Sequence, residues 1–184
     1  MSSRDPQLPD GTENETTVLW APWRMRYIEE KKSQGCIFCI SSEEKSLREN
    51  LILRVTPYVC VMLNKYPYNN GHLMVAPHRH TADLAELSDQ EFSDLMHEVR
   101  SAVGTLKTAL QPQGINVGLN LGVCAGAGIA DHLHWHAVPR WTGDTNFMPV
   151  IGTVRVMPQH LFESYDRLRP YFLSSSPAVG GSSN

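Results

Sequence analysis

Residues 131–138 read DHLHWHAV and place a histidine at every second position: His132, His134 and His136. In an extended strand successive side chains point to opposite faces, so the three imidazoles should share one face of the strand. An imidazole titrates near pH 7 and can serve as a metal ligand, a proton carrier or a nucleophile. A merely solvated strand face is the alternative, but it more readily carries threonine, lysine, serine or glutamate. The pattern therefore predicts a strand with a functional row of histidines.

The composition indicates one globular domain. The chain has 184 residues, a formal net charge of −3 and 41% hydrophobic residues, which suits one substantial core and not two domains. This charge argues against a broad nucleic-acid-binding surface but leaves small nucleotides as partners. No segment approaches the ~20 apolar residues of a membrane span, and no signal peptide is evident. We therefore expect a cytoplasmic protein that binds neither nucleic acid nor membrane.

The two ends of the chain differ in composition from its middle. Residues 1–16 are polar and rich in turn formers, and residues 173–184 form a Ser/Gly tail, so both ends should be disordered. Residues 17–172 should form a single domain. Within it, residues 20–32 combine an early proline with good helix formers, which predicts a short helix or arm that docks on the domain.

The middle of the chain predicts an antiparallel meander followed by one long helix. Short apolar, β-branched runs are separated by turn residues at 51–55, 59–64 and 72–76. Ser88 and Glu91 form a capping box, and apolar residues then recur at helical spacing up to Leu110, ahead of Pro112.

Two further strands and a last helix are expected in the second half. Residues 115–121 alternate as a strand, residues 122–130 form a glycine-rich loop that leads to the histidine strand, and residues 158–171 resemble a helix. This order predicts an α+β fold: an antiparallel sheet with one long amphipathic helix and a C-terminal helix.

The glycine-rich segment lies directly before the histidines. Residues 118–130 read GLNLGVCAGAGIA, and such small residues let backbone N–H groups approach an anion closely. Glycine also serves plain tight turns, so the loop alone is ambiguous. Its position next to the histidine row favours a phosphate-binding loop.

The histidine run resembles the His-x-His-x-His-x-x motif, with apolar x, of the histidine triad superfamily of nucleotide hydrolases and transferases. Asn120, the glycine-rich loop and Pro139-Arg140 are also similar to that superfamily. Other segments resemble its bacterial diadenosine tetraphosphate phosphorylase branch: residues 19–25 (LWAPWRM), 64–75 (NKYPYNNGHLMV) and 140–148 (RWTGDTNFM). The resemblance implies the histidine triad fold.

The resemblance also implies roles for the histidines. His134 would attack the α-phosphorus of a nucleotide and form a covalent adenylyl-imidazole, which splits one displacement into two. His136 would contact the phosphate and support the nucleophile, while His132 would orient its neighbours or bind a metal. His72 receives no role.

A nucleotide-binding set follows from the same resemblance. Asn64 would meet the ribose hydroxyls, and Trp141 would line the substrate site unless it is a packing residue after the strand. Phosphate oxygens would be held by Asn120 and by loop amides of Gly126, Ala127 and Gly128. Relatives usually carry Ser, Thr or Gln late in this loop, where this chain has glycine, isoleucine and alanine at 128–130. One side-chain donor to phosphate is therefore missing.

Cys36 and Cys39 form a Cys-x-x-Cys pair, which in this setting indicates metal binding or redox chemistry more than a disulfide framework. In zinc-containing relatives the remaining ligands come from a Pro-x-x-His segment and the first triad histidine. The resemblance thus implies a structural zinc site made of Cys36, Cys39, His80 and His132. The alternative is a pair of reduced cysteines, which would leave His132 to the active site.

The implied activity is transfer of an adenylyl group from diadenosine tetraphosphate to His134 and then to inorganic phosphate, giving ATP and ADP. One alternative is a hydrolase of dinucleoside polyphosphates or adenosine phosphoramidates that releases AMP. Another is a non-catalytic nucleotide- or metal-binding interaction protein. Superfamily members are usually homodimers, so the resemblance also implies a homodimer.

Overall fold

The computed structural model describes residues 35–40, 44–144 and 159–174. The expected docking arm at 20–32 and residues 145–148 of the branch-like segment lie outside these ranges, as do most residues of the two expected tails. Along the chain the helices and strands are α2 (Glu44–Glu49), β1 (Ile52–Val55), β2 (Val59–Leu63), β3 (Leu73–Pro77), α3 (Asp89–Leu110), β4 (Gly114–Leu119), β5 (Trp135–Arg140) and α5 (Leu161–Ser174). Two short 3-10 turns, Leu84–Glu86 and Val123–Ala125, lie in the connections.

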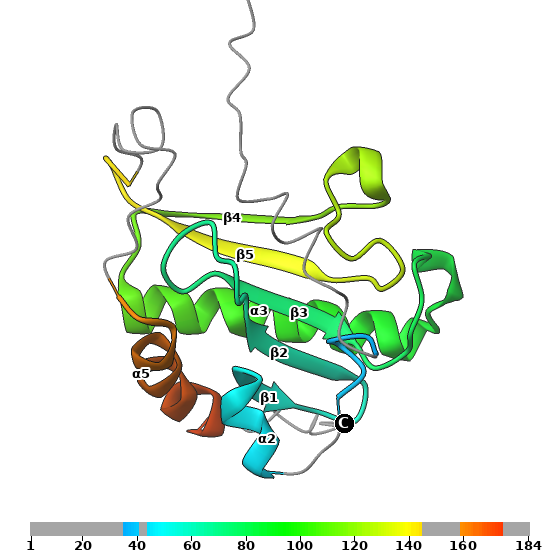
Figure 1. Ribbon diagram of the computed structural model, residues 1–184, viewed down its shortest axis with the longest axis horizontal. Coiled ribbons are helices and arrows are strands. Elements are labelled where there is room, and N and C mark those ends of the chain that lie inside the picture. The colour runs from blue at the N-terminus through cyan, green and yellow to red at the C-terminus, as the bar shows by residue number, and fades with distance from the viewer. Residues whose placement is uncertain (1–34, 41–43, 145–158, 175–184) are drawn as a thin grey trace, which may run out of the picture.

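All five strands pair antiparallel in one sheet, in the order β1-β2-β3-β5-β4 (Figure 1). β5 therefore lies inside the sheet, where His136 is opposite Met74 of β3 and Gly118 of β4. This architecture confirms the α+β fold expected from the sequence. The last helix begins at Leu161 and ends at Ser174, two residues inside the stretch that was expected to be a tail.

Each face of the sheet has its own core. Alternate side chains of β2 point toward α3 and α5 and join the larger core, because successive residues of a strand face opposite ways. The others point to the opposite face and join a smaller core with Phe38, Ile52, Met74 and Ala76. All five residues of β2 are consequently buried. Figure 1 shows α3 crossing one face of the sheet, which leaves the other face to the segment around Phe38.

The long helix α3 begins and ends where its sequence predicts. The Ser88 hydroxyl accepts the N–H of Glu91 at 3.3 Å, and the Glu91 carboxylate accepts the N–H of Ser88 at 2.8 Å, which completes the capping box. At the other end Gln111 adopts a left-handed conformation, with φ of 50°, directly before Pro112. A residue before proline is disfavoured in the helical region, so the helix stops there.

None of the helices in the described ranges is long and apolar enough to cross a membrane.

Candidate active site and metal centre

The histidine row lies at the start of β5 and not entirely within it. β5 begins at Trp135, so His132 and His134 precede it, which corrects the expectation that the strand spans the whole run. The physical reason is a hydrogen bond outside the sheet. The N–H of Leu133 donates to the carbonyl of Thr81, in the loop after β3, at 2.7 Å, so Leu133 does not pair with a neighbouring strand. His134 and His136 nonetheless share a face: their rings lie 4.9 Å apart, on the side of the sheet that carries Phe38 and Met74.

A hydrogen bond to the backbone determines which ring nitrogen of His134 keeps its lone pair. Its Nδ1 lies 2.8 Å from the carbonyl oxygen of His132. A carbonyl can only accept, so Nδ1 carries the hydrogen and Nε2 keeps its lone pair in the neutral ring. Burial lowers the pKa of His134, whose exposed fraction is 4%, so the ring is neutral near pH 7. His134 thus presents an unprotonated Nε2, which is what a nucleophile requires.

His136 is held by a fourth histidine for which the sequence suggested no role. The N–H of Tyr68 donates to Nδ1 of His72 at 3.1 Å, so the hydrogen of His72 lies on Nε2. That Nε2 lies 2.9 Å from Nδ1 of His136 and donates to it. The hydrogen of neutral His136 is therefore on Nε2, available as a donor to an anion. Burial, together with the neighbouring His134, lowers the pKa of His136 to about 4.

The sequence around His72 indicates that this residue needs a hydrogen-bond partner, but it does not indicate which one. It is fully buried, and it directly precedes the apolar run of β3, where a histidine needs a hydrogen-bond partner. The amide nitrogen of the Asn64 side chain also lies 3.4 Å from its Nδ1. The partner itself is on β5, and only the pairing of β3 with β5 identifies it.

The four expected metal ligands come together at the other end of the row. Nε2 of His132 donates to the carbonyl of Pro77 at 2.9 Å, which leaves a lone pair on Nδ1. This Nδ1 lies 3.3 Å from Sγ of Cys36, 3.8 Å from Sγ of Cys39 and 3.2 Å from Nδ1 of His80. Tetrahedral zinc with thiolate and imidazole ligands separates its ligand atoms by about 3.3–3.8 Å. The donor set therefore fits a zinc ion, and the four ligand atoms all lie within 4.8 Å of one another.

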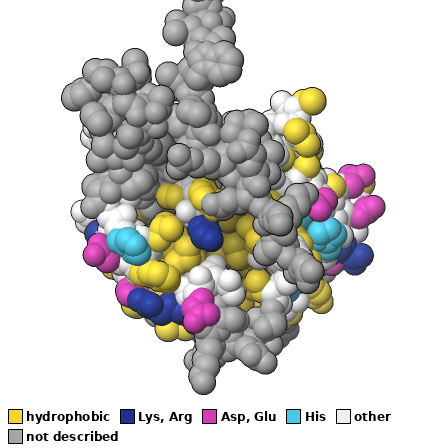
Figure 2. Space-filling model, viewed as in Figure 1, with side chains coloured by type: hydrophobic (Ala, Val, Ile, Leu, Met, Phe, Trp, Pro, Cys, Tyr) yellow, Lys and Arg dark blue, Asp and Glu magenta, His cyan; other side chains and the backbone are white. Residues whose placement is uncertain are grey.

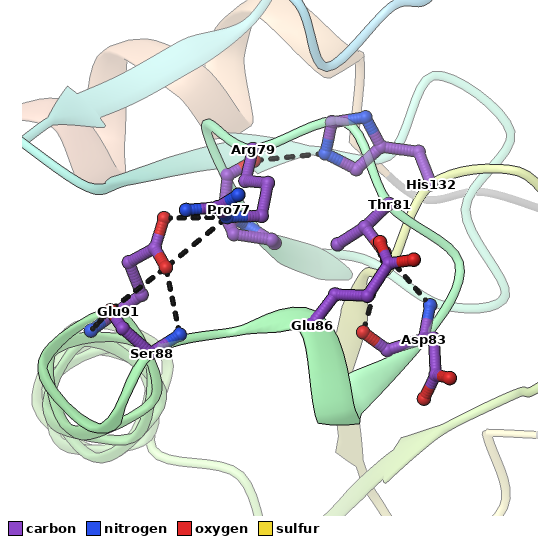
Figure 3. A network of polar contacts seen from close by, with 8 residues as sticks. All are labelled: Pro77, Arg79, Thr81, Asp83, Glu86, Ser88, Glu91 and His132. Atoms are coloured by element: carbon purple, nitrogen blue, oxygen red, sulfur yellow. Dashed lines mark hydrogen bonds and ion pairs between the residues drawn. The ribbon is translucent and has the colours of Figure 1, made fainter.

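The loop between β3 and α3 contains His80. Hydrogen bonds hold this part of the chain to α3 on one side and to His132 on the other (Figure 3). Arg79 donates to the carboxylate of Glu91 at 2.9 Å, and the same carboxylate completes the capping box of α3. Arg79 and Ser88 together lower the pKa of Glu91 to about 2, so this carboxylate stays charged. On the other side the carbonyl of Pro77 receives the ring N–H of His132. Helix α3 thus anchors the segment that presents His80.

The expected nucleotide-binding residues are distributed unevenly around this site. Asn64, next to His72, lies beside the triad. In the glycine-rich loop the N–H groups of Gly126 and Ala127 donate to loop carbonyls, at 2.9 and 3.2 Å, and the side chain of Asn120 lies 3.5 Å from the carbonyl of Gly126. Trp141 follows the far end of β5, about 20 Å of strand away from His134 in the same chain. The sheet therefore does not bring Trp141 to the triad of its own chain.

The turn that carries Trp141 is held by a buried carboxylate. The side chain of Asp144, 8% exposed, accepts from Arg140 at 2.6 Å and from Asn69 at 2.8 Å. It also accepts the N–H of Trp141 at 3.1 Å. Asp144 thus joins the end of β5 to the segment that contains Tyr68 and His72.

Figure 2 shows hydrophobic side chains gathered over the sheet on the face opposite α3.

Residues 46–143, which include the complete histidine row and the glycine-rich loop, match the HIT domain family. The chain belongs to the HIT domain family. This confirms the superfamily expected from the histidine run. Among the relatives of this HIT protein is the AP-4-A phosphorylase of Mycobacterium tuberculosis (strain H37Rv), 40% identical over 159 residues, which are 82% of each chain. The resemblance to the phosphorylase branch is thereby confirmed as a similarity.

Other relatives of this HIT protein carry different names. The adenosine 5'-monophosphoramidase of Schizosaccharomyces pombe is 30% identical over 58% of this chain and 74% of its own. A Zn-bound histidine triad family protein from Mycobacterium smegmatis has a similar structure, with a TM-score of 0.57 at 22% identity, covering 76% of this chain and 94% of that one. At that identity the structural likeness speaks for the fold.

Proposed function

We propose that this HIT protein is a nucleotidyl transferase that cleaves diadenosine tetraphosphate with inorganic phosphate, giving ATP and ADP, through an adenylyl group on His134. The observation that carries the proposal is the unprotonated Nε2 of His134, assigned by the hydrogen bond from Nδ1 to the carbonyl of His132. The phosphorylase named among the relatives, at 40% identity, supports the choice of substrate.

The transfer takes place in two displacements on one nitrogen. Nε2 of His134 forms a bond to the α-phosphorus, and the bond from that phosphorus to the bridging oxygen breaks, so ATP leaves with the electron pair. The adduct is an imidazolium, whose Nδ1–H is held by the carbonyl of His132. A phosphate oxygen then attacks the same phosphorus, ADP forms, and Nε2 recovers its electron pair. Covalent catalysis of this kind replaces one difficult step by two easier ones.

The other residues of the site would bind and stabilise. His136 would donate its Nε2–H to a phosphate oxygen, where negative charge gathers in the transition state. Asn64 would bind the ribose, and Asn120 with the loop amides at 126–128 would hold phosphate. For the amides of Gly126 and Ala127 this requires that the loop release its internal hydrogen bonds when nucleotide binds.

Phosphate dependence tests the acceptor. With diadenosine tetraphosphate and inorganic phosphate, we expect ATP and ADP in equal amounts by chromatography. Without phosphate, we expect about one ATP per active site and slow release of AMP, because the adenylyl-histidine then has only water as an acceptor. AMP formed at equal rates with and without phosphate would instead make the protein a hydrolase, the activity suggested by the monophosphoramidase relative.

We propose that Cys36, Cys39, His80 and His132 hold a structural zinc ion, which would fix the position of His132. Elemental analysis of protein that never met a chelator should give about one zinc per chain. Cys39→Ser should lose this zinc, because it removes one of the two thiolates. Cys124→Ser is the matched control, since Cys124 is exposed and not among the clustered ligands. Equal zinc content in the two variants would contradict the assignment.

We also propose a homodimer in which β4 pairs with a second copy. β4 is an edge strand of the sheet described above, and Val117 and Leu121 on and after it are 45% and 51% exposed. Residues 114–122 carry no charged side chain, whereas exposed edge strands are usually protected by charges. The mass of the protein in solution tests this. The cytoplasmic location expected from the sequence stays a prediction.

A further inference from the structure

Phe38 connects the metal cluster to the expected nucleophile. It lies in the Cys-x-x-Cys turn, between two of the four clustered ligands. Its side chain is completely buried, and its ring stacks on that of His134, with centroids 4.9 Å apart and an angle of 27° between the planes. The same ring also contacts His132 at 5.1 Å. One aromatic side chain thus touches both a metal-ligand candidate and the nucleophile.

The imidazole of His134 is confined on three sides. Its Nδ1 is held by the carbonyl of His132, its face rests on Phe38, and its ring meets that of His136 edge-on, at 4.9 Å and 76°. A single hydrogen bond leaves a ring free to tilt about that bond. The stacked face of Phe38 opposes this tilt, and so it directs Nε2 toward one position.

The turn formed by residues 36–39 sets the position of Phe38 relative to the smaller core. The N–H of Cys39 donates to the carbonyl of Cys36 at 3.1 Å, which closes the turn around Phe38. Cys36 and Cys39 direct their sulfur atoms to the Nδ1 atoms of His132 and His80. On its inner side Phe38 packs in the smaller core of the sheet. With a metal bound to the four clustered residues, ligands on both sides of Phe38 would hold its backbone close to His132.

We propose that Phe38 is a positioning residue for His134, and that metal binding by the Cys-x-x-Cys turn sets the position of Phe38. The proposal rests on the proposed function, because it concerns the same nucleophile. It gives the metal cluster an effect on the active site beyond stability, since a nucleophile misplaced by about 1 Å can slow a reaction about 100-fold.

Kinetics of the first displacement test the role of Phe38. In Phe38→Leu the site stays apolar but loses the flat face, so we expect adenylyl-histidine to form about 10- to 100-fold more slowly in single turnovers. Binding of AMP should change less than about 2-fold, because the nucleotide contacts remain. Phe172→Leu is the matched control: Phe172 is also buried, at 3%, but lies in the larger core on the other face of the sheet. Equal rates in the two variants would overturn the proposal.

A readout without turnover tests the coupling to the metal. The ring current of Phe38 should displace the carbon-bound proton resonances of His134, assigned with His134→Gln. We expect these resonances to move when zinc is removed, to return when zinc alone is added back, and to respond little to zinc in Phe38→Leu. Resonances of His134 that are unchanged by zinc in the wild-type protein would refute the coupling.

Failure of the proposed function is recognised separately. Wild-type protein that forms no adenylyl adduct by intact-mass spectrometry would reject the proposed transfer reaction, whatever Phe38 does. The resonance measurement would then still decide whether the metal cluster positions the ring of His134 through Phe38.

Discussion

Replacing His134 with alanine should abolish the adenylyl adduct and lower the turnover of diadenosine tetraphosphate by roughly 10⁴-fold or more, as expected when a covalent nucleophile is lost. Nε2 of His134 keeps its lone pair, because the hydrogen of the neutral ring is on Nδ1, where it is donated to the carbonyl of His132. His136 cannot take its place, because His72 donates to its Nδ1 and its own hydrogen lies on Nε2. Intact-mass spectrometry after mixing with substrate measures the adduct directly.

A matched control for this variant is His97→Ala. His97 is an exposed histidine on α3, on the opposite side of the sheet from the triad, so both adduct and turnover should persist. An adduct of undiminished yield in His134→Ala would assign the nucleophile to another residue. Absence of an adduct in the wild-type protein, with nucleotide left intact, would favour a protein that only binds nucleotide or metal.

His72→Phe should lower kcat by roughly 10²- to 10⁴-fold with little change in KM. In another enzyme, replacing the group that holds a catalytic histidine in one tautomer lowers kcat by about 10⁴-fold. Phenylalanine fills the buried space but donates nothing to Nδ1 of His136 and accepts nothing from the N–H of Tyr68. His136 is then free to place its hydrogen on Nδ1, where it cannot serve the phosphate. Steady-state kinetics and nitrogen-15 chemical shifts of His136 report the two effects.

His78→Phe separates this role from general packing. His72 precedes β3 and His78 follows it, and His78 donates to the carbonyl of Thr56, at 2.7 Å, away from the triad. Each variant removes the partner of a partly buried backbone group, the N–H of Tyr68 or the carbonyl of Thr56, and a lost hydrogen bond of this kind typically costs about 1 kcal/mol of stability. Only His72→Phe should change the tautomer of His136. Equal losses of kcat in the two variants would show that His72 acts through stability alone.

Local signals in the sequence were sufficient for much of the fold. Ser88 and Glu91 place the start of α3 because a capping box involves residues three apart. The stop at Gln111 follows from Pro112, whose ring disfavours helical geometry in the residue before it. Alternation along residues 132–137 predicted which side chains share a face, since this depends only on the pleat of the strand.

The sequence predicted those residues of the candidate site that belong to a recognisable motif. The histidine row and the Cys-x-x-Cys pair are visible in the sequence. The resemblance implied His80 as a further metal ligand, and the structure places its Nδ1 3.2 Å from Nδ1 of His132. His72 and Phe38 were not found. Their partners are 64 and 96 residues away along the chain, on β5 and just before it, and no local pattern specifies contacts of that range.

By itself, the sequence determined the chemical types of the site: imidazoles in a row, thiolates in a pair, and small residues in a loop. Only the tertiary structure decided what each imidazole can do. Which nitrogen of His132, His134 or His136 carries hydrogen depends on the acceptor or donor that faces it, and these partners are Pro77, the backbone of His132, and His72. The physical reason is that a neutral imidazole has two nearly equivalent tautomers, and a single hydrogen bond in a buried site selects one of them.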